Sequence, residues 1–142
     1  MNINFGYLLE GAKTAGGIAV IIDVFRAFSC TALMFSLGIK KSILVRDPHE
    51  ALALKHCHQD YILAGEVNGL AIEGFDLGNS PSEILSQKSS FFTGKTAVQR
   101  TSAGVQGALT ALEIADEVIV AGYNVARATA KYILAKQPAQ VS

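Results

Sequence analysis

The sequence predicts an α/β protein with a three-layer α/β/α arrangement and a mostly parallel sheet, a mixed sheet being the alternative. Short runs of β-branched and apolar residues alternate with segments of helical composition along the chain. Thirteen glycines against three prolines are typical of many tight strand-to-helix turns. With 50% hydrophobic and 17% charged residues, the chain is apolar enough for one packed domain over residues 1–142.

The first strand is expected at residues 18–24, a continuous apolar run of the kind that is covered on both faces. The next helix is expected at residues 26–37, because Gly38 is a favoured C-cap residue. The other strands are expected at residues 42–45, 61–64, 96–100 and 117–121. Helices are expected at residues 47–57, from residue 80, at 102–115 and at 124–136.

Two of these helix starts have a specific signal. Asp47-Pro48 and Ser80-Pro81 each place a capping side chain before a proline at the first helical position, with a glutamate three residues after the cap.

The segment between residues 65 and 80 is different, since it holds four glycines and three carboxylates without periodicity. We expect a long irregular loop there, which is more often functional than not.

Charge and cysteine content exclude several classes of protein. Twelve basic and twelve acidic residues give a net charge of zero, so neither nucleic acid nor an anionic membrane is an expected partner. The apolar stretch at residues 18–28 contains Asp23 and Arg26 and is not expected to span a membrane. Only two cysteines occur, Cys30 and Cys57, which fits a reducing compartment and predicts a cytoplasmic protein.

Common catalytic motifs are absent. Residues 93–96 resemble the end of a phosphate loop, but Ser89 stands at the first glycine position and a strand follows where one should precede. Neither a dinucleotide-binding glycine motif nor a serine-nucleophile elbow is present. His56 and His58 are expected at a helix C-terminus, and Cys30 is expected in the core.

Polar residues that follow the predicted strands are the candidates for chemistry. Because the carboxyl ends of parallel strands share one edge of a sheet, ligands bind there. The candidates are Asp23 and Arg26 after the first strand, Glu66 after the third, Arg100, Thr101 and Ser102 after the fourth, Asn124 after the fifth, and Glu73, Asp76, Asn79 and Ser80 in the long loop.

These residue types indicate a metal-assisted site for a small phosphorylated acid. Carboxylates and neutral oxygens suit Mg²⁺, and arginines suit a phosphate or carboxylate held by two hydrogen bonds. Helix N-termini near Ser80, Ser102 and Asn124 add backbone N–H donors. The structural alternative is that Asp23 and Arg26 pair at a strand end while the loop carboxylates are solvated.

Four segments resemble the 2-phosphosulfolactate phosphatase family: residues 21–27 (Ile-Ile-Asp-Val-Phe-Arg-Ala), Gly65-Glu66, residues 74–81 (Gly-Phe-Asp-Leu-Gly-Asn-Ser-Pro) and residues 100–104 (Arg-Thr-Ser-Ala-Gly). The resemblance implies a three-layer α/β/α fold and Mg²⁺-dependent hydrolysis of the phosphate ester of a 2-hydroxy acid. The family's named substrate is 2-phosphosulfolactate, in coenzyme M biosynthesis, and a related phospho-hydroxy acid is the alternative.

Transferred by position, the resemblance implies a set of site residues. Asp23, Arg26, Glu66 and Asp76 become catalytic candidates, and the carboxylates of Asp23, Glu66 and Asp76 become Mg²⁺ ligands. Substrate-binding candidates are Asn79, Ser80, Thr101 and Ser102, to which the strand-end argument adds Arg100 and Asn124. The sequence departs from the family pattern at Ala103, where asparagine is common, and at Val105, which replaces threonine.

Two other functions stay open at this point: a non-catalytic anion-binding remnant of the family, and an α/β interaction domain. Residues 137–142 have the composition of a helix exit followed by the first residues of a strand. A chain truncated at its C-terminus is therefore one alternative, and a complete domain is the other. Because truncation would leave a sheet edge uncovered, a homo-oligomer is an expected partner state.

Overall fold

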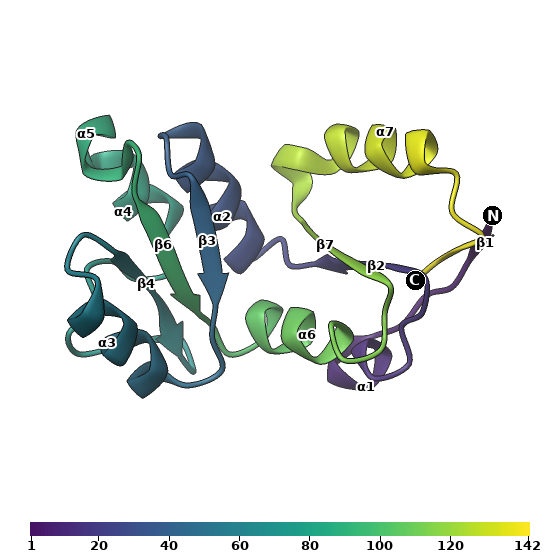
Figure 1. Cartoon of the computed structure of the whole chain (residues 1–142), viewed down its shortest axis with the longest axis horizontal. Helices are drawn as coiled ribbons and strands as arrows, with labels where there is room; N and C mark the ends of the chain where they lie inside the picture. Colours follow the sequence, from purple (N-terminus) through teal and green to yellow (C-terminus); the bar gives the residue numbers. More distant parts are fainter.

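The computed structural model describes residues 1–142 and confirms the α/β class, with its strands divided between two four-stranded sheets (Figure 1). The first sheet has the order β1 (Asn2–Ile3), β8 (Gln140–Val141), β2 (Ile18–Ile22) and β7 (Glu117–Ala121), all parallel. The second has the order β3 (Lys41–Leu44), β6 (Thr96–Arg100), β4 (Ile62–Val67) and β5 (Leu70–Ala71), with only β5 antiparallel.

Helices cover both faces of each sheet (Figure 1). They are α1 (Leu8–Ala12), α2 (Ala27–Ser36), α3 (Pro48–Cys57), α4 (Pro81–Ser86), α5 (Ser89–Phe92), α6 (Gly104–Ala111), the 3-10 turn η1 (Tyr123–Val125) and α7 (Ala126–Lys136). In the first sheet α7 lies over one face, and α1 and α6 lie over the other. None of these helices has the length and apolar character needed to cross a membrane.

All five predicted strands are present, but the expected single sheet is two sheets. The reason lies in α2 and α6, which carry the chain from one sheet to the other and back. Ala27 and Phe28 of α2 and Ala108 of α6 are buried together and pack against strands of both sheets. Small side chains on these helices let the two sheets share one core while their strands pair separately.

Four short elements were not predicted, and one of them is α5, a single turn at Ser89–Phe92. The first residues form β1 and α1, which are too short to show a periodic pattern. The long loop contains β5, whose backbone pairs with the end of β4 to make a hairpin at Glu66–Ala71. A loop of sixteen residues is thus partly ordered by strand pairing, which hydrophobic periodicity does not reveal.

The predicted helix caps are confirmed. Asp47 accepts a hydrogen bond from the backbone N–H of His49 at 2.7 Å, with Pro48 in the first turn. Ser80 accepts from the N–H of Glu83 at 3.5 Å, and the carboxylate of Glu83 accepts from the N–H of Gly78 at 2.9 Å. These bonds satisfy donors that a helix N-terminus leaves unpaired.

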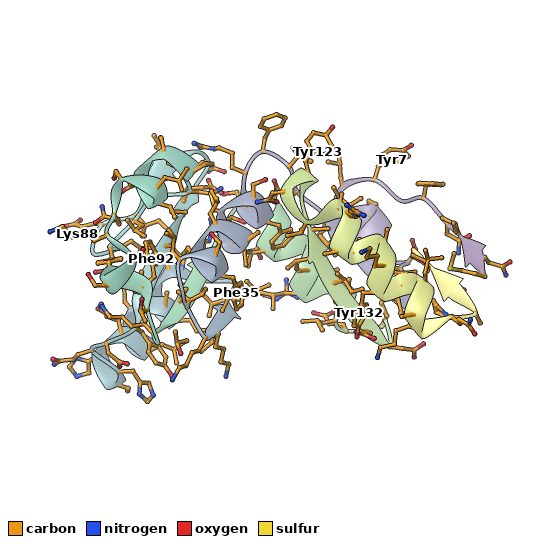
Figure 2. All side chains as sticks on the ribbon, turned by 90° about the horizontal axis from the view of Figure 1, so that it is seen from above. Tyr7, Phe35, Lys88, Phe92, Tyr123 and Tyr132 are labelled. Carbon is orange, nitrogen blue, oxygen red and sulfur yellow. The ribbon has the colours of Figure 1, made fainter.

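Phe28 is the largest buried side chain between the two sheets, at 1% exposure. We expect Phe28→Ala to lower the free energy of unfolding by about 3–5 kcal/mol, because it removes the ring and leaves a cavity. Phe35 on the same helix (labelled in Figure 2) is 46% exposed and provides the matched control. Urea denaturation of both variants measures the difference, and equal losses would contradict the assignment of Phe28 to a shared core.

Candidate functional site at the strand ends

Asp23 follows β2 and lies between the N-termini of two helices. Its Oδ1 accepts a hydrogen bond from the N–H of Ala27, at the start of α2, at 3.3 Å. At the start of α6, a Cβ added to Gly104 would lie 2.5 Å from Asp23 Oδ2. Gly104 is therefore required for the close approach of α6 to this carboxylate. The N-termini of α2 and α6, which are the positive ends of the helix dipoles, both lie beside Asp23.

The turn that precedes α6 is held by side chains. The buried hydroxyl of Thr101 accepts a hydrogen bond from the N–H of Val105 at 3.1 Å and caps the helix. The N–H of Ser102 is also engaged, because it donates to Glu66. The N–H groups of Ala103 and Gly104 have no acceptor in the protein, as is usual at a helix N-terminus, and Ala103 is exposed whereas Gly104 is buried.

Glu66 occupies the centre of a hydrogen-bond network. Its Oε1 accepts from the N–H of Ser102 at 2.6 Å, and its Oε2 accepts from the N–H of Gly69 at 2.6 Å and from the Ser102 hydroxyl at 3.2 Å. Glu66 therefore ties the β4–β5 hairpin to the turn between β6 and α6. With three donors on its two oxygens, the carboxylate is occupied by the protein itself.

Hydrogen bonding controls the ionisation of Glu66. Burial raises the pKa of its carboxyl group, but the N–H donors of Gly69 and Ser102, the Ser102 hydroxyl and the charge of Arg100 together lower that pKa by more. The net result is a pKa below the ordinary value of 4.5. Glu66 is therefore a carboxylate at neutral pH, in the state that its three donors require.

Arg100 binds the backbone carbonyls of two neighbouring segments. Its Nη1 donates to the carbonyl of Glu66 at 2.8 Å and to the Ser102 hydroxyl at 3.1 Å, and its Nε donates to the carbonyl of Arg46 at 3.3 Å. These bonds give Arg100 a role in holding the turn before α6, and its substrate-binding role stays a prediction. Gly65 lets the backbones of β4 and β6 approach closely beside Arg100, since a Cβ at Gly65 would collide with the backbone carbonyl of Arg100.

Asp76 lies apart from Asp23 and Glu66. Its Oδ2 accepts from the Lys55 ammonium at 3.1 Å and from the N–H of Leu63, near the start of β4, at 2.8 Å. The structure brings no three histidine, cysteine or acidic side chains together as a metal cluster. The expectation that Asp23, Glu66 and Asp76 converge on one ion is therefore corrected, because Asp76 anchors the long loop to β4.

The remaining polar candidates have local roles. Ser80 caps α4 and also contacts the Ser82 hydroxyl at 3.0 Å, while Asn79 is half-buried in the loop before it. The side-chain amide of Asn124 donates to the carbonyl of Ser29, in the first turn of α2, at 3.1 Å. Asn124 therefore joins η1 to α2 near Asp23, whereas Ser80 acts on the helix it caps.

Arg26 is exposed at the N-cap of α2 and forms no ion pair, so the alternative in which it pairs with Asp23 is not observed. Both side chains lie near the Cys30 thiol. The pKa of the Cys30 thiol is raised to about 11, mainly by burial. The charge of Arg26 lowers this pKa and the charge of Asp23 raises it, both to smaller extents. Cys30 is 1% exposed, and its prediction as a core residue is confirmed.

A groove of about 920 Å³ lies beside Asp23. Its polar lining residues include Asp23, Arg46, Ser102 and Gln106, and most of its apolar lining comes from the N-terminal segment and β2. Arg46 and Gln106 were missed from the sequence. Arg46 follows the carboxyl end of β3, so the rule that selected the other candidates would also have selected Arg46.

A carboxylate between two helix N-termini, beside unpaired amides and an unpaired arginine, defines an α/β protein whose strand-end site suits an anion. The chain belongs to the 2-phosphosulpholactate phosphatase family, whose model matches residues 7–142. It is 42% identical over 116 residues to a probable 2-phosphosulfolactate phosphatase of Bacillus subtilis, and 36% identical over 118 residues to one of Deinococcus radiodurans. A protein of the same name from Thermus thermophilus is 34% identical over 114 residues.

These matches confirm the family resemblance and also define its extent. They cover 82%, 83% and 80% of this chain but only 49%, 48% and 46% of the three relatives. The chain therefore spans about half the length of the curated relatives it matches.

The Glu66 network predicts a specific pH dependence of stability. Because the folded pKa of Glu66 lies below 4.5, its stabilising contribution is present above about pH 4.5 and is lost as the pH falls through the folded pKa. We expect Glu66→Gln to cost about 1–3 kcal/mol at neutral pH, since a Gln amide leaves N–H donors unpaired. The cost should shrink as the solution becomes acidic.

Chemical denaturation from about pH 7 down to about pH 2 measures this dependence, because the stabilising contribution is lost only below about pH 4.5. Glu73→Gln is the matched control, because Glu73 is exposed in the same loop region and makes no side-chain contact with a donor. A cost that is the same at all pH values, or that is equal in the two variants, would show that the Glu66 carboxylate does not hold the turn.

Proposed function

We propose that the chain acts in Mg²⁺-dependent hydrolysis of the phosphate ester of a small 2-hydroxy acid, converting 2-phosphosulfolactate and water to sulfolactate and phosphate. The observation that carries the proposal is the position of Asp23 between the N-termini of α2 and α6, in a chain whose relatives are named for this substrate. In the net reaction the ester P–O bond breaks, the oxygen of water ends on phosphorus, and the released alkoxide takes up a proton from that water.

Asp23 fits a Mg²⁺ ion better than the other two predicted ligands. Its carboxylate accepts one hydrogen bond and forms no ion pair, whereas Glu66 has three donors and Asp76 is bound to Lys55 and Leu63. Mg²⁺ at phosphate sites is usually held by one or two carboxylates, with waters and substrate oxygens as the other ligands. Asp23 would hold the ion, which when bound offsets the charge of the phosphoryl oxygens.

The substrate's anionic groups are matched by donors on either side of Asp23. Arg26 has no carboxylate partner, so its guanidinium is free to bind two phosphoryl oxygens at once. The unpaired N–H groups of Ala103 and Gly104 provide further donors at the start of α6. Arg46 lines the same groove, and its guanidinium donates to the exposed Glu113 at 2.6 Å and to the Thr110 hydroxyl at 3.4 Å. Exchange of the exposed Glu113 contact would let Arg46 bind the sulfonate or carboxylate of the substrate.

Phosphate release from 2-phosphosulfolactate tests the proposal. With the full chain we expect release in Mg²⁺, its loss in EDTA, and a decrease of about 100-fold or more in Asp23→Asn, because the metal-binding charge is removed. Asp116→Asn, an exposed aspartate before β7, is the control and should keep its activity. A substrate that raises the melting temperature without releasing phosphate would instead indicate the anion-binding alternative.

Arg26→Lys separates charge from hydrogen-bond geometry. Lysine keeps the positive charge but loses the planar fork, so we expect the affinity for the phosphate ester to fall about tenfold. The melting temperature should hardly change, because the Arg26 side chain makes no hydrogen bond in the protein. Calorimetric titration compares it with Arg127→Lys on the exposed face of α7, and unchanged affinity in Arg26→Lys would remove Arg26 from the site.

A further inference from the structure

Arg46 follows the carboxyl end of β3, where its backbone is held beside the first turns of α6 (Figure 1). The carbonyl of Arg46 accepts hydrogen bonds from Arg100 Nε at 3.3 Å and from Gln106 Nε2 at 3.2 Å. The preceding residue, Val45, donates its N–H to the carbonyl of Gln99 at 3.0 Å. The backbone that carries the Arg46 side chain is therefore fixed, and the direction of the side chain is what can change.

The guanidinium of Arg46 lies along α6, toward the C-terminal end of this helix. Its Nη1 donates to the Thr110 hydroxyl at 3.4 Å, and its Nη2 donates to Glu113 Oε1 at 2.6 Å. Thr110 and Glu113 come four and seven residues after Gln106, about one and two helical turns further along. Glu113 thus holds the guanidinium away from Gly104, where α6 meets the candidate site.

Arg46 lines two cavities that differ in their charged groups. One is the groove that also contains Asp23. The other has a volume of about 330 Å³ and is lined by the carboxylates of Glu50 and Glu113 among apolar residues of β3 and α6. The Arg46 side chain therefore lies between an anion of the protein and the place where an anionic ligand is proposed to bind.

The pair of Arg46 and Glu113 is easily exchanged. The two side chains are 45% and 67% exposed, so water screens their attraction. An exposed ion pair of this kind contributes little to stability, because each side chain loses conformational freedom in forming it. An acidic group of a ligand can therefore take the place of Glu113 at small cost, while the backbone of Arg46 stays fixed.

We propose that Arg46 is a specificity-determining residue, which Glu113 holds in the free protein and releases to the second acidic group of a phosphorylated acid. Glu113 acts as a competing counter-ion: a ligand carboxylate or sulfonate replaces it, whereas a phosphate ester without such a group leaves it in place. Selectivity is then the difference between two affinities that share every contact except the one with Arg46. The inference rests on the proposed function, which places the phosphate beside Asp23.

Two phosphonates test the inference without being hydrolysed. The probes 3-phosphonopropionate and propylphosphonate differ only in a terminal carboxylate, which the second replaces with a methyl group. We expect calorimetric titration of the full chain in Mg²⁺ to show tighter binding of 3-phosphonopropionate. Arg46→Met should lower the ratio of the two affinities about tenfold, because the guanidinium that binds the carboxylate is removed. Glu113→Gln should raise the affinity for 3-phosphonopropionate about threefold, because the competing carboxylate is removed.

Two controls separate this competition from a general effect of charge. Glu50→Gln removes a carboxylate from the same small cavity, but Glu50 forms no ion pair, so the affinity for 3-phosphonopropionate should stay near that of the parent chain. In a chain that already carries Arg46→Met, Glu113→Gln should have no effect, because no guanidinium remains to be released.

Equal gains in Glu113→Gln and Glu50→Gln, or a gain from Glu113→Gln that persists beside Arg46→Met, would overturn the inference. An unchanged affinity ratio in Arg46→Met would overturn it as well and leave the proposed function in place. A parent chain that bound neither probe would refute both. If the chain showed the expected selectivity but released no phosphate from 2-phosphosulfolactate, the inference would be supported and the proposed reaction would be wrong.

Discussion

The carboxylate of Glu66 accepts hydrogen bonds from the amide of Gly69 and from both the amide and the hydroxyl of Ser102, so it joins a hairpin of one sheet to the turn that leads into the other. That turn determines where α6 begins, and the start of α6 is in contact with Asp23 through Gly104. Arg100 reinforces the turn from the same side. The geometry around Asp23 therefore depends on an acidic group that is itself occupied, which is why a carboxylate at a strand end need not be a metal ligand.

Two helix N-termini with the same carboxylate between them form an electrostatically unusual arrangement. Each end has unpaired N–H groups and a positive potential, and Asp23 compensates part of it while Arg26 adds to it. The balance favours a ligand with more than one negative charge, because a single carboxylate leaves donors unsatisfied. The proposed substrate, a phosphate ester with a second acidic group, has more than one negative charge.

Much of the fold could be predicted from residue patterns. The apolar runs gave the strands, and Asp47 and Ser80 marked helix starts, because these signals are local. The division into two sheets depends on which strands pair, and this depends on how Phe28 and Ala108 pack between them. Periodicity carries no information on that packing.

The site was predictable in its location and less so in its chemistry. Strand ends selected Asp23 in the first sheet and Glu66 and Ser102 in the second, and the turn before α6 brings them near one another, since Ser102 bonds Glu66 and Gly104 approaches Asp23. The position of Asp76 was not predicted, because its partner Lys55 is 21 residues away in the sequence and contacts it only in the folded protein. In the sequence alone, a loop carboxylate that binds a lysine cannot be told from one that binds an amide or a metal ion.

The two sheets also differ in how far apart their strands lie along the chain. The second sheet uses residues 41–71 and 96–100, a nearly continuous middle segment, whereas the first combines residues 2–22 with residues 117–141. On a ribosome the middle segment can pair its strands before the later residues emerge, while β2 waits for β7. During synthesis the apolar strand β2 therefore stays without its partner while about 95 further residues are translated, and an unpaired apolar strand is a site of aggregation in that interval.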